Sequence, residues 1–497
     1  MLLLGLDIGT SSIKASLIDA KDLTIIGSAQ YPEEEAPISS PQPGWAEQAP
    51  GEWWNHTKLA IASLSKKTGV NFNEVKAIGI SYQMHGLVAV NKEHEVLRPS
   101  IIWCDSRAVE IGNKAFDTIG HERSLERLLN SPGNFTASKL AWVKQFEKES
   151  YEQIEKVMLP GDYIAMKLTG DVTTSISALS EGIFWDFRDD ALSEDVFGHY
   201  EIEKSFIPEI RDVFSVHGRI SGESATELGL PEGIPVTYKA GDQPNNALSL
   251  NVLKPGEVAA TAGTSGVIYA VTDTLLYDKL SRVNTFAHVN YTPDKKRLGV
   301  LLCINGTGIL NRWAKNTYGS GISYKEMNEL AGQVNIGSDG ITVLPFGNGA
   351  ERILNNEQIG AHILNLDLNR HTKAHIFRAV QEGIAFAFRY GLDIMRENGI
   401  RPEVIRAGNA NMFQSPVFRD AFVNVTGIPV ELYENDGSVG AAIGAGVGAG
   451  LFNSFEEAFS NFKPVQVISA DRTTPYEEAY TSWKADLEMI IESKSKN

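Results

Sequence analysis

Two aspartates follow short apolar runs, at points where a strand would pass into a tight turn. Asp7 follows the run 2–6, and Asp242 follows the run 234–240 after a single glycine. A carboxylate in such a place can accept the proton of a hydroxyl whose oxygen attacks phosphorus, or hold Mg²⁺ through water. We predict the first role for Asp242 and the second for Asp7. The alternative is an aspartate that only forms a turn, since Asp is common in turns.

A Gly-Thr-Ser turn comes shortly after Asp7 and recurs far downstream. The first copy, Gly9-Thr10-Ser11, is followed by Lys14, and the second, Gly263-Thr264-Ser265, lies between two apolar runs within 258–271. Backbone N–H groups in such turns form concavities that bind anions, and the hydroxyls and the lysine add donors. A polar turn with a solvated lysine is the alternative for either copy alone. The repeat favours phosphate binding by two facing turns and indicates an internal duplication.

Two further segments combine polar groups with apolar or aromatic ones, as a sugar site requires. Gln83-Met84-His85-Gly86 ends the apolar run 75–81 and supplies directional polar groups for hydroxyls beside an apolar contact for the carbon face. Trp103 offers an indole face close to the acid and planar donor of Asp105-Ser106-Arg107. The alternatives are a histidine satisfied by its surroundings and an exposed Asp/Arg pair that gives only local order.

The order of the apolar runs predicts an α/β fold of two similar halves. Strand-like runs alternate with amphipathic ones, which is typical of α/β proteins. A boundary near residue 245 gives domains 1–245 and 246–497, each with one Gly-Thr-Ser hairpin. We predict helices over 51–65, 137–154, 372–398, 415–426 and 439–451. The last is rich in Gly and Ala, so the Gly-x-Gly-x-x-Ala pattern at 444–449 indicates close helix packing rather than a dinucleotide site.

Composition narrows the class of partner. The 497 residues suit two large domains with a ligand cleft between them, and 42% hydrophobic with 22% charged residues is typical of a globular protein. A net charge of −17 opposes binding to nucleic acid or to an anionic membrane. Cys104 and Cys303 are too few for a disulfide framework, and no apolar run is long enough to span a bilayer. We therefore expect a cytoplasmic protein, and leave its oligomeric state open, with a homodimer among the options.

Five motifs in this order resemble the FGGY carbohydrate kinases along nearly the whole chain: Asp7-Ile8-Gly9-Thr10-Ser11, Gly44-Trp45-Ala46-Glu47-Gln48, Gln83-Met84-His85-Gly86, Gly241-Asp242-Gln243 and Ala262-Gly263-Thr264-Ser265. Within the family, Gln-Met-His-Gly and the segments 97–107 and 135–143 resemble the xylulokinases. The resemblance implies two actin-like, ribonuclease-H-like domains of the sugar kinase/Hsp70/actin superfamily around a cleft for ATP and sugar. It implies that D-xylulose is the sugar and that Mg²⁺ accompanies the ATP.

The resemblance also implies roles for individual residues. Asp242 would be the general base, and Asp7 would orient hydrated Mg²⁺. The expected sugar contacts are Gln83, Met84, His85, Trp103, Asp105 and Gln243. The expected nucleotide and phosphate contacts are Thr10, Ser11, Lys14, Gly263, Thr264, Ser265, Gly308, Arg312, Gly408 and Asn409. Gln243 stands where many xylulokinases carry Asn, and the loop 407–415 departs from the family's adenine-side pattern.

Three rival functions remain open at this point. The first is a kinase for another sugar or polyol, such as ribulose, gluconate or glycerol. The second is a catalytically silent actin-like protein that senses sugar or nucleotide, against which the presence of both Asp7 and Asp242 argues. The third is a chaperone-like ATPase, which would need a peptide-binding β-domain that the tail past Leu451 is too short to form.

Overall fold

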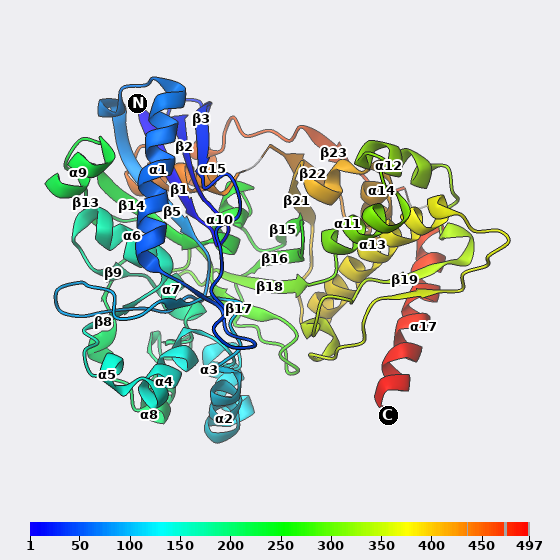
Figure 1. The fold of residues 1–497 in the computed structure, drawn as a ribbon, viewed down its shortest axis with the longest axis horizontal. Helices are drawn as coiled ribbons and strands as arrows, with labels where there is room; N and C mark the ends of the chain where they lie inside the picture. Colours follow the sequence, from blue (N-terminus) through cyan, green and yellow to red (C-terminus); the bar gives the residue numbers. More distant parts are fainter. Residues whose placement is uncertain (435, 472–474, 496–497) are drawn as a thin grey trace.

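The computed structural model describes residues 1–434, 436–471 and 475–495, and two large β-sheets organise the molecule (Figure 1). One sheet belongs to the first half of the chain, coloured from blue to green, and the other to the second half, coloured from green to orange. Within the described ranges, no helix is both long and apolar enough to cross a membrane.

The first sheet has the order β13-β14-β5-β1-β2-β3. Its strands are β1 (Leu2–Ile8), β2 (Ile13–Asp19), β3 (Ile25–Tyr31), β5 (Val75–Tyr82), β13 (Gly218–Arg219) and β14 (Pro235–Gly241). β1, β2 and β3 are antiparallel neighbours, whereas β5 and β14 run parallel to β1. Parallel neighbours place their carboxyl ends at one edge of the sheet, so the residues that follow β1, β5 and β14 come together there.

The second sheet repeats this plan. Its order is β17-β18-β16-β15-β21-β22-β23, in which β18, β16, β15, β21, β22 and β23 correspond to β3, β2, β1, β5, β14 and β13. The strands are β15 (Glu257–Ala262), β16 (Gly266–Thr272), β17 (Asn284–Ala287), β18 (Leu298–Ile304), β21 (Val404–Gly408), β22 (Val430–Tyr433) and β23 (Gln466–Ile468). The directions match as well, since β15 pairs antiparallel with β16 and parallel with β21. The predicted duplication is confirmed, with β17 as an added edge strand.

The remaining elements cover the sheets and build the loops. The helices are α1 (Pro50–Thr68), α2 (Val109–Ile119), α3 (His121–Leu128), α4 (Thr136–Phe146), α5 (Lys148–Tyr151), α6 (Pro160–Thr169), α7 (Ile176–Glu181), α8 (Glu194–Tyr200), α9 (Gly222–Leu228), α10 (Asp242–Ser249), α11 (Gly308–Tyr318), α12 (Tyr324–Gly332), α13 (Lys373–Glu397), α14 (Pro416–Thr426), α15 (Gly437–Gly448), α16 (Phe455–Ala458) and α17 (Tyr476–Ser495). Short strands are β4 (Glu47–Gln48), β6 (Val88–Val90), β7 (Ser100–Ile101), β8 (Lys156–Met158), β9 (Thr173–Thr174), β10 (Trp185–Asp186), β11 (Ala191–Leu192), β12 (Glu209–Ile210), β19 (Thr342–Leu344) and β20 (His362–Leu364). Short 3₁₀ helices are η1 (Phe72–Glu74), η2 (Lys204–Phe206), η3 (Ser338–Gly340), η4 (Arg352–Leu354) and η5 (Asn411–Gln414).

One predicted helix is divided. The run 137–154 forms α4 and α5, because Glu147 between them has φ −129° and ψ 57°, which is outside the helical region. The other predicted helices agree with α1, α13, α14 and α15, apart from differences at their ends. The amphipathic pattern therefore located this segment and missed the break within it.

Strand β1 shows how one strand serves two cores. Leu4 and Leu6 pack in the core that includes residues of α1 and α6, while Leu3 packs with Ala441 of α15 on the opposite face. This alternation follows from the two-residue period of a strand. Both faces of the first sheet are thus buried, and one of them is covered by a helix from the second half of the chain.

Close packing of α15 on the first sheet requires glycine in the strands below it. A Cβ on Gly5 would lie 1.8 Å from the carbonyl oxygen of Ser438, and one on Gly79 would lie 1.9 Å from that of Ala441. A hydrogen bond of 2.7 Å between the hydroxyls of Ser16 and Ser438 adds to this contact. The interpretation of the Gly/Ala-rich segment as a closely packed helix is confirmed.

We expect Gly79→Ala to destabilise the protein by about 1–3 kcal/mol, because the new methyl group would overlap backbone that cannot move aside. Thermal unfolding followed by circular dichroism measures this. Gly51→Ala in α1 is the matched control, since no atom lies within 4 Å of the position that its Cβ would take. Equal melting temperatures of the two variants would contradict the packing argument.

Candidate functional site

A cavity of about 520 Å³ collects most of the predicted sugar and phosphate residues. Eight of its lining residues were predicted from the sequence: Thr10, Gln83, Met84, His85, Trp103, Asp242, Gln243 and Ser265. They come from the carboxyl ends of β1, β5 and β14, from the loop 102–106 and from the second Gly-Thr-Ser turn. We call this the sugar cavity.

Asp242 is the first residue of α10 and directly follows β14. Burial, reinforced by the negative charge of Asp7, raises the pKa of Asp242 to about 7. Hydrogen bonds from Gln243 oppose part of this rise. A carboxylate with a pKa near neutrality is suited to general-base catalysis, because it is ionised at working pH and still has affinity for a proton.

Asp7 lies against the amino terminus of α15. A Cβ on Gly437, the first residue of that helix, would lie 2.6 Å from Asp7 Oδ2. Burial raises the pKa of Asp7, and the nearby charge of Asp436 adds to the rise. The positive end of the helix dipole favours a carboxylate at this place.

The donors at Asp7 fit a hydrated magnesium ion. Among the described residues, no group of three or more His, Cys, Asp or Glu side chains is arranged to hold a metal. Mg²⁺ commonly binds through one or two carboxylates and completes its octahedron with water and substrate phosphates. The coupled pair of Asp7 and Asp242 offers that kind of partial site.

His85 is neutral and has a defined tautomer. Burial lowers its pKa to about 3, and the charges of Lys139 and Arg352 contribute. Its Nδ1 lies 3.0 Å from the carbonyl oxygen of Glu181, which can only accept, so Nδ1 carries the proton. Nε2 is thereby left as an acceptor for a hydroxyl.

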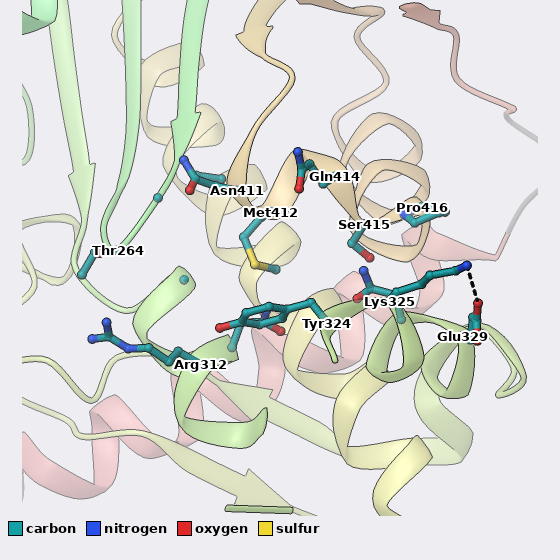
Figure 2. A pocket seen from close by; sticks show the side chains of 15 residues that line it. Thr264, Arg312, Tyr324, Lys325, Glu329, Asn411, Met412, Gln414, Ser415 and Pro416 are labelled. Atoms are coloured by element: carbon teal, nitrogen blue, oxygen red, sulfur yellow. Dashed lines mark ion pairs between the residues drawn. The ribbon is translucent and has the colours of Figure 1, made fainter. Parts of the chain in front are cut away.

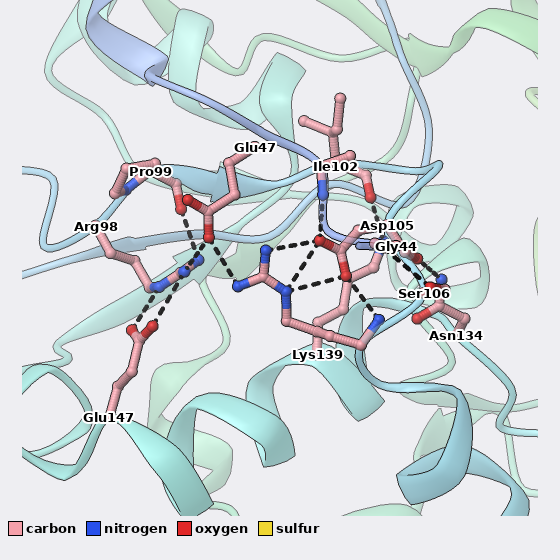
Figure 3. Close-up of polar contacts among 12 residues, drawn as sticks. Gly44, Glu47, Arg98, Pro99, Ile102, Asp105, Ser106, Asn134, Lys139 and Glu147 are labelled. Atoms are coloured by element: carbon pink, nitrogen blue, oxygen red, sulfur yellow. Dashed lines mark hydrogen bonds and ion pairs between the residues drawn. The ribbon is translucent and has the colours of Figure 1, made fainter. Parts of the chain in front are cut away.

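The two loops of the sugar cavity are held together by a buried lysine. Lys139 Nζ donates to the carbonyl oxygen of His85 over 2.8 Å. It also donates over 3.0 Å to the carbonyl oxygen of Ile102, the residue before Trp103; Figure 3 labels Lys139 and Ile102. Burial lowers the pKa of Lys139 to about 7. Sequence reasoning placed Lys139 only within a family-like segment and did not identify this role.

A short hydrogen-bond chain connects the first phosphate turn with the sugar residues. Trp103 Nε1 donates to Thr10 Oγ1 over 3.0 Å, and this hydroxyl donates to Gln83 Oε1 over 2.9 Å. The indole of Trp103 is nevertheless 53% exposed. The side chains predicted for phosphate and for sugar therefore adjoin one another.

Asp105 does not line the sugar cavity, contrary to the predicted sugar contact. It is fully buried, and its Oδ2 accepts the N–H of Ala46 (2.6 Å) and Nη2 of Arg107 (2.7 Å). Its backbone oxygen accepts a hydrogen bond from Asn134 (Figure 3). With its carboxylate occupied, Asp105 fixes the loop that carries Trp103, and it supports Asn134, which does line the cavity.

A second cavity, of about 720 Å³, contains four of the predicted nucleotide residues: Gly263, Thr264, Gly308 and Arg312 (Figure 2). We call this the nucleotide cavity. Its opposite side is formed by Tyr324, Lys325, Asn328 and Glu329 of α12 and by Asn411, Met412 and Gln414 of η5. The residues of η5 belong to the loop 407–415, which the sequence placed near the adenine without assigning individual contacts. Sequence reasoning missed the residues of α12, because a surface helix with polar residues carries no local sign of what it faces.

The amino terminus of helix α11 packs directly against the second Gly-Thr-Ser turn. The N–H of Gly308 donates to the carbonyl oxygen of Gly263 over 2.8 Å, and that of Ile309 donates to Thr264 over 3.2 Å. A Cβ on Gly308 would lie 2.3 Å from the Gly263 oxygen, so glycine is needed there. The turn and the amino terminus of α11 form one unit beside the nucleotide cavity.

Four of the predicted nucleotide and phosphate contacts lie outside both cavities, as do Asp7 and Asp105. Lys14 Nζ pairs with Asp436 Oδ2 at 3.2 Å, and Ser11 is exposed. Gly408 ends β21, and Asn409 Nδ2 donates to Glu434 Oε1 over 3.1 Å. Other residues of the two Gly-Thr-Ser turns line the cavities, such as Thr10, Thr264 and Ser265. Lys14 and Asn409 instead have partners within the protein, and Ser11 faces solvent.

Known proteins resemble the chain over its whole length. Residues 2–249 match the N-terminal domain and residues 258–449 the C-terminal domain of the FGGY family of carbohydrate kinases. Xylulose kinase of Haemophilus influenzae is 31% identical over 415 residues, which are 81% of each chain. The structure of xylulose kinase from Rhodospirillum rubrum, 26% identical, superimposes with a TM-score of 0.87 over 99% of both chains. Gluconate kinase from Lactobacillus acidophilus, 21% identical, has a TM-score of 0.88 over 100% of this chain and 99% of its own, which shows the fold alone.

Proposed function

Because the chain belongs to the FGGY family of carbohydrate kinases, we propose that it transfers the γ-phosphate of ATP to the terminal O5 of D-xylulose. One observation carries this proposal: Asp242 stands in the wall of one cavity together with Thr10 of the first Gly-Thr-Ser turn and Ser265 of the second. The xylulose kinases among the similar proteins support the choice of sugar.

Asp242 acts as the general base. It accepts the proton of the attacking hydroxyl as the new O–P bond forms, while ADP leaves with the electrons of the broken bond. The raised pKa fits this role, since the base must take up a proton near neutral pH.

The two turns hold the phosphates from opposite sides, with backbone N–H groups as the main donors. Bound Mg²⁺ would neutralise charge on the phosphate oxygens, and Asp7 would orient its waters. Closure of the two halves around the sugar would exclude water, so that the sugar hydroxyl rather than water takes the phosphate.

The sugar is held by polar side chains that form directional hydrogen bonds with its hydroxyls. His85 Nε2 accepts a hydrogen bond from one sugar hydroxyl, and Gln83, Gln243 and Trp103 line the same cavity. Met84 is buried there and contacts the carbon skeleton. A neutral histidine suits an uncharged sugar, because no counter-ion has to be desolvated with it.

An assay of ADP release with a panel of sugars tests the proposal. D-xylulose should give the highest kcat/KM among ketoses, polyols and aldonic acids, because discrimination is expressed in that ratio. A higher kcat/KM for ribulose, gluconate or glycerol would refute D-xylulose as the substrate but leave the assignment as a sugar kinase intact. No ADP release with any of them would favour a silent sensor.

A further inference from the structure

An arginine of the second half of the chain faces the sugar cavity and has no role so far. Arg352 begins η4, in the segment between β19 and β20, and lines the cavity together with His85 and Asn284. Its positive charge acts on the imidazole of His85 across the cavity, where it helps to lower the pKa of that ring. Burial lowers the pKa of Arg352 itself, and a guanidinium remains charged after such a shift.

A relay of amides fixes the orientation of this guanidinium. Arg352 Nη1 donates to Asn284 Oδ1, and Asn284 Nδ2 donates to Asn130 Oδ1 over 2.9 Å. Asn130 in turn donates through Nδ2 to the carbonyl oxygen of Thr285 over 2.7 Å. Because the last acceptor is a carbonyl, each amide along the relay has one possible orientation, and Asn284 must present its oxygen to Arg352.

The charge of Arg352 is left uncompensated. The buried arginines Arg98 and Arg378 pair with acids, Arg98 with Glu47 and Arg378 with Glu382, both at 2.7 Å. Within residues 1–434, 436–471 and 475–495, no carboxylate oxygen is recorded within 4.0 Å of Arg352. The adjacent Glu351 instead accepts the backbone N–H of Asn305, 3.1 Å from each of its oxygens.

In the part of the chain that the structure describes, Asp242 is the one acidic residue that lines this cavity, and the other lining residues apart from Arg352 are uncharged. Asn134, Asn305 and Asn356 line the cavity beside the arginine. Arg352 is half-buried, and a cation that is partly withdrawn from water without an acid at ion-pair distance is costly. A ligand oxygen that accepts its free N–H groups recovers part of that cost. A carbonyl or carboxylate oxygen accepts such a fork of donors without offering a competing proton, whereas an alcohol is a weaker acceptor.

We propose that Arg352 determines the substrate class by binding an acceptor oxygen, the carbonyl of a ketose or the carboxylate of an aldonic acid, at the end of the substrate away from the phosphorylated hydroxyl. This inference rests on the proposed sugar kinase activity and adds a contact from the second half of the chain. The substrate then touches both halves, with Asp242 and His85 on one side and Arg352 on the other.

Steady-state kinetics of Arg352→Ala and Arg352→Lys test the proposal. With D-xylulose, Arg352→Ala should lower kcat/KM by about 10- to 100-fold, mainly through the sugar KM, because a charged hydrogen bond is lost. With the polyols made by reducing D-xylulose, the loss should be much smaller, so that selectivity for the ketose collapses. D-gluconate tests whether Arg352 binds a carboxylate, and a loss of the same kind is expected with it if the wild type accepts this acid. The kcat/KM of Arg352→Lys should lie between those of the wild type and Arg352→Ala, since lysine keeps the charge and loses the planar pair of N–H donors. Added guanidine should partly restore the activity of Arg352→Ala.

Two companion variants separate charge from structure. Asn284→Asp places a carboxylate next to the guanidinium and should weaken ketose binding although Arg352 is still present. Arg123→Ala removes an arginine whose side chain is 55% exposed and lies outside both cavities, and it should leave the kinetics unchanged. Melting temperatures establish that each variant is folded.

Equal losses for ketose, acid and polyol, or unchanged kinetics in Arg352→Ala, would overturn the assignment. If the wild type phosphorylates none of these compounds, the proposed function fails, and binding is then measured through the fluorescence of the protein's tryptophans. Binding of a ketose or a sugar acid that Arg352→Ala abolishes would still support Arg352. Binding unchanged by that substitution would refute it.

Discussion

Replacing Asp242 by alanine is expected to lower kcat by about 10²–10⁴-fold, the usual contribution of general-base catalysis. The carboxylate that would accept the hydroxyl proton is then missing from the cavity wall. Asp242→Asn keeps the shape of the side chain and removes its basicity, so it should lose nearly as much. Initial rates of ADP release at saturating ATP and D-xylulose measure the effect.

The same variants should bind the sugar with little change, because the loss falls on the chemical step rather than on the contacts of His85 and Gln83. Asp117→Asn is the matched control, since that aspartate is 75% exposed and lies outside the sugar cavity. Turnover of Asp242→Ala at the wild-type rate would refute the assignment of the base.

The pH dependence of kcat/KM should show an acid limb with an apparent pKa near 7. Burial and the charge of Asp7 raise the pKa of Asp242 to about 7, so the carboxyl is protonated below this pH and cannot act as a base. The rate should therefore fall about tenfold for each pH unit below the pKa, or roughly 100-fold at pH 5. Initial rates with sugar well below its KM, between pH 5 and 9, report the free enzyme.

Asp7→Asn distinguishes the source of this shift. It removes the negative charge that adds to the rise in the pKa of Asp242, so the acid limb of the pH profile should move to lower pH. The proposed metal role of Asp7 predicts that this variant is also slower. A limb that stays near pH 7 in Asp7→Asn would show that the charge of Asp7 does not act on the base.

Local patterns were enough to predict the strands and the two turns. β1, β2, β15 and β16 are short apolar runs on either side of Gly-Thr-Ser, and the strand signal and the turn signal both lie within a few neighbouring residues. The positions of Asp7 and Asp242 followed directly, since each comes at the end of such a strand. The likeness of the two halves followed from the repeated turn, whereas the order of the strands in each sheet came only from the structure.

Contacts between distant segments were beyond such patterns. Asp105 has the residue type of a ligand, yet its carboxylate is occupied by Arg107 two residues along and by the N–H of Ala46, 59 positions away. Lys14 has the type of a phosphate donor and pairs with Asp436, a residue 422 positions away. Which acid or base is already satisfied depends on the packing of remote segments.

The sequence therefore determined which residue types stand at the ends of the strands, because strand and turn propensities act over a few neighbours. The folded chain decided which of them share a cavity, how far burial raises the pKa of Asp242, and that Arg352 from the second half faces His85 from the first. Burial and charge at a site are sums over all segments packed around it, and no short stretch of sequence contains that sum.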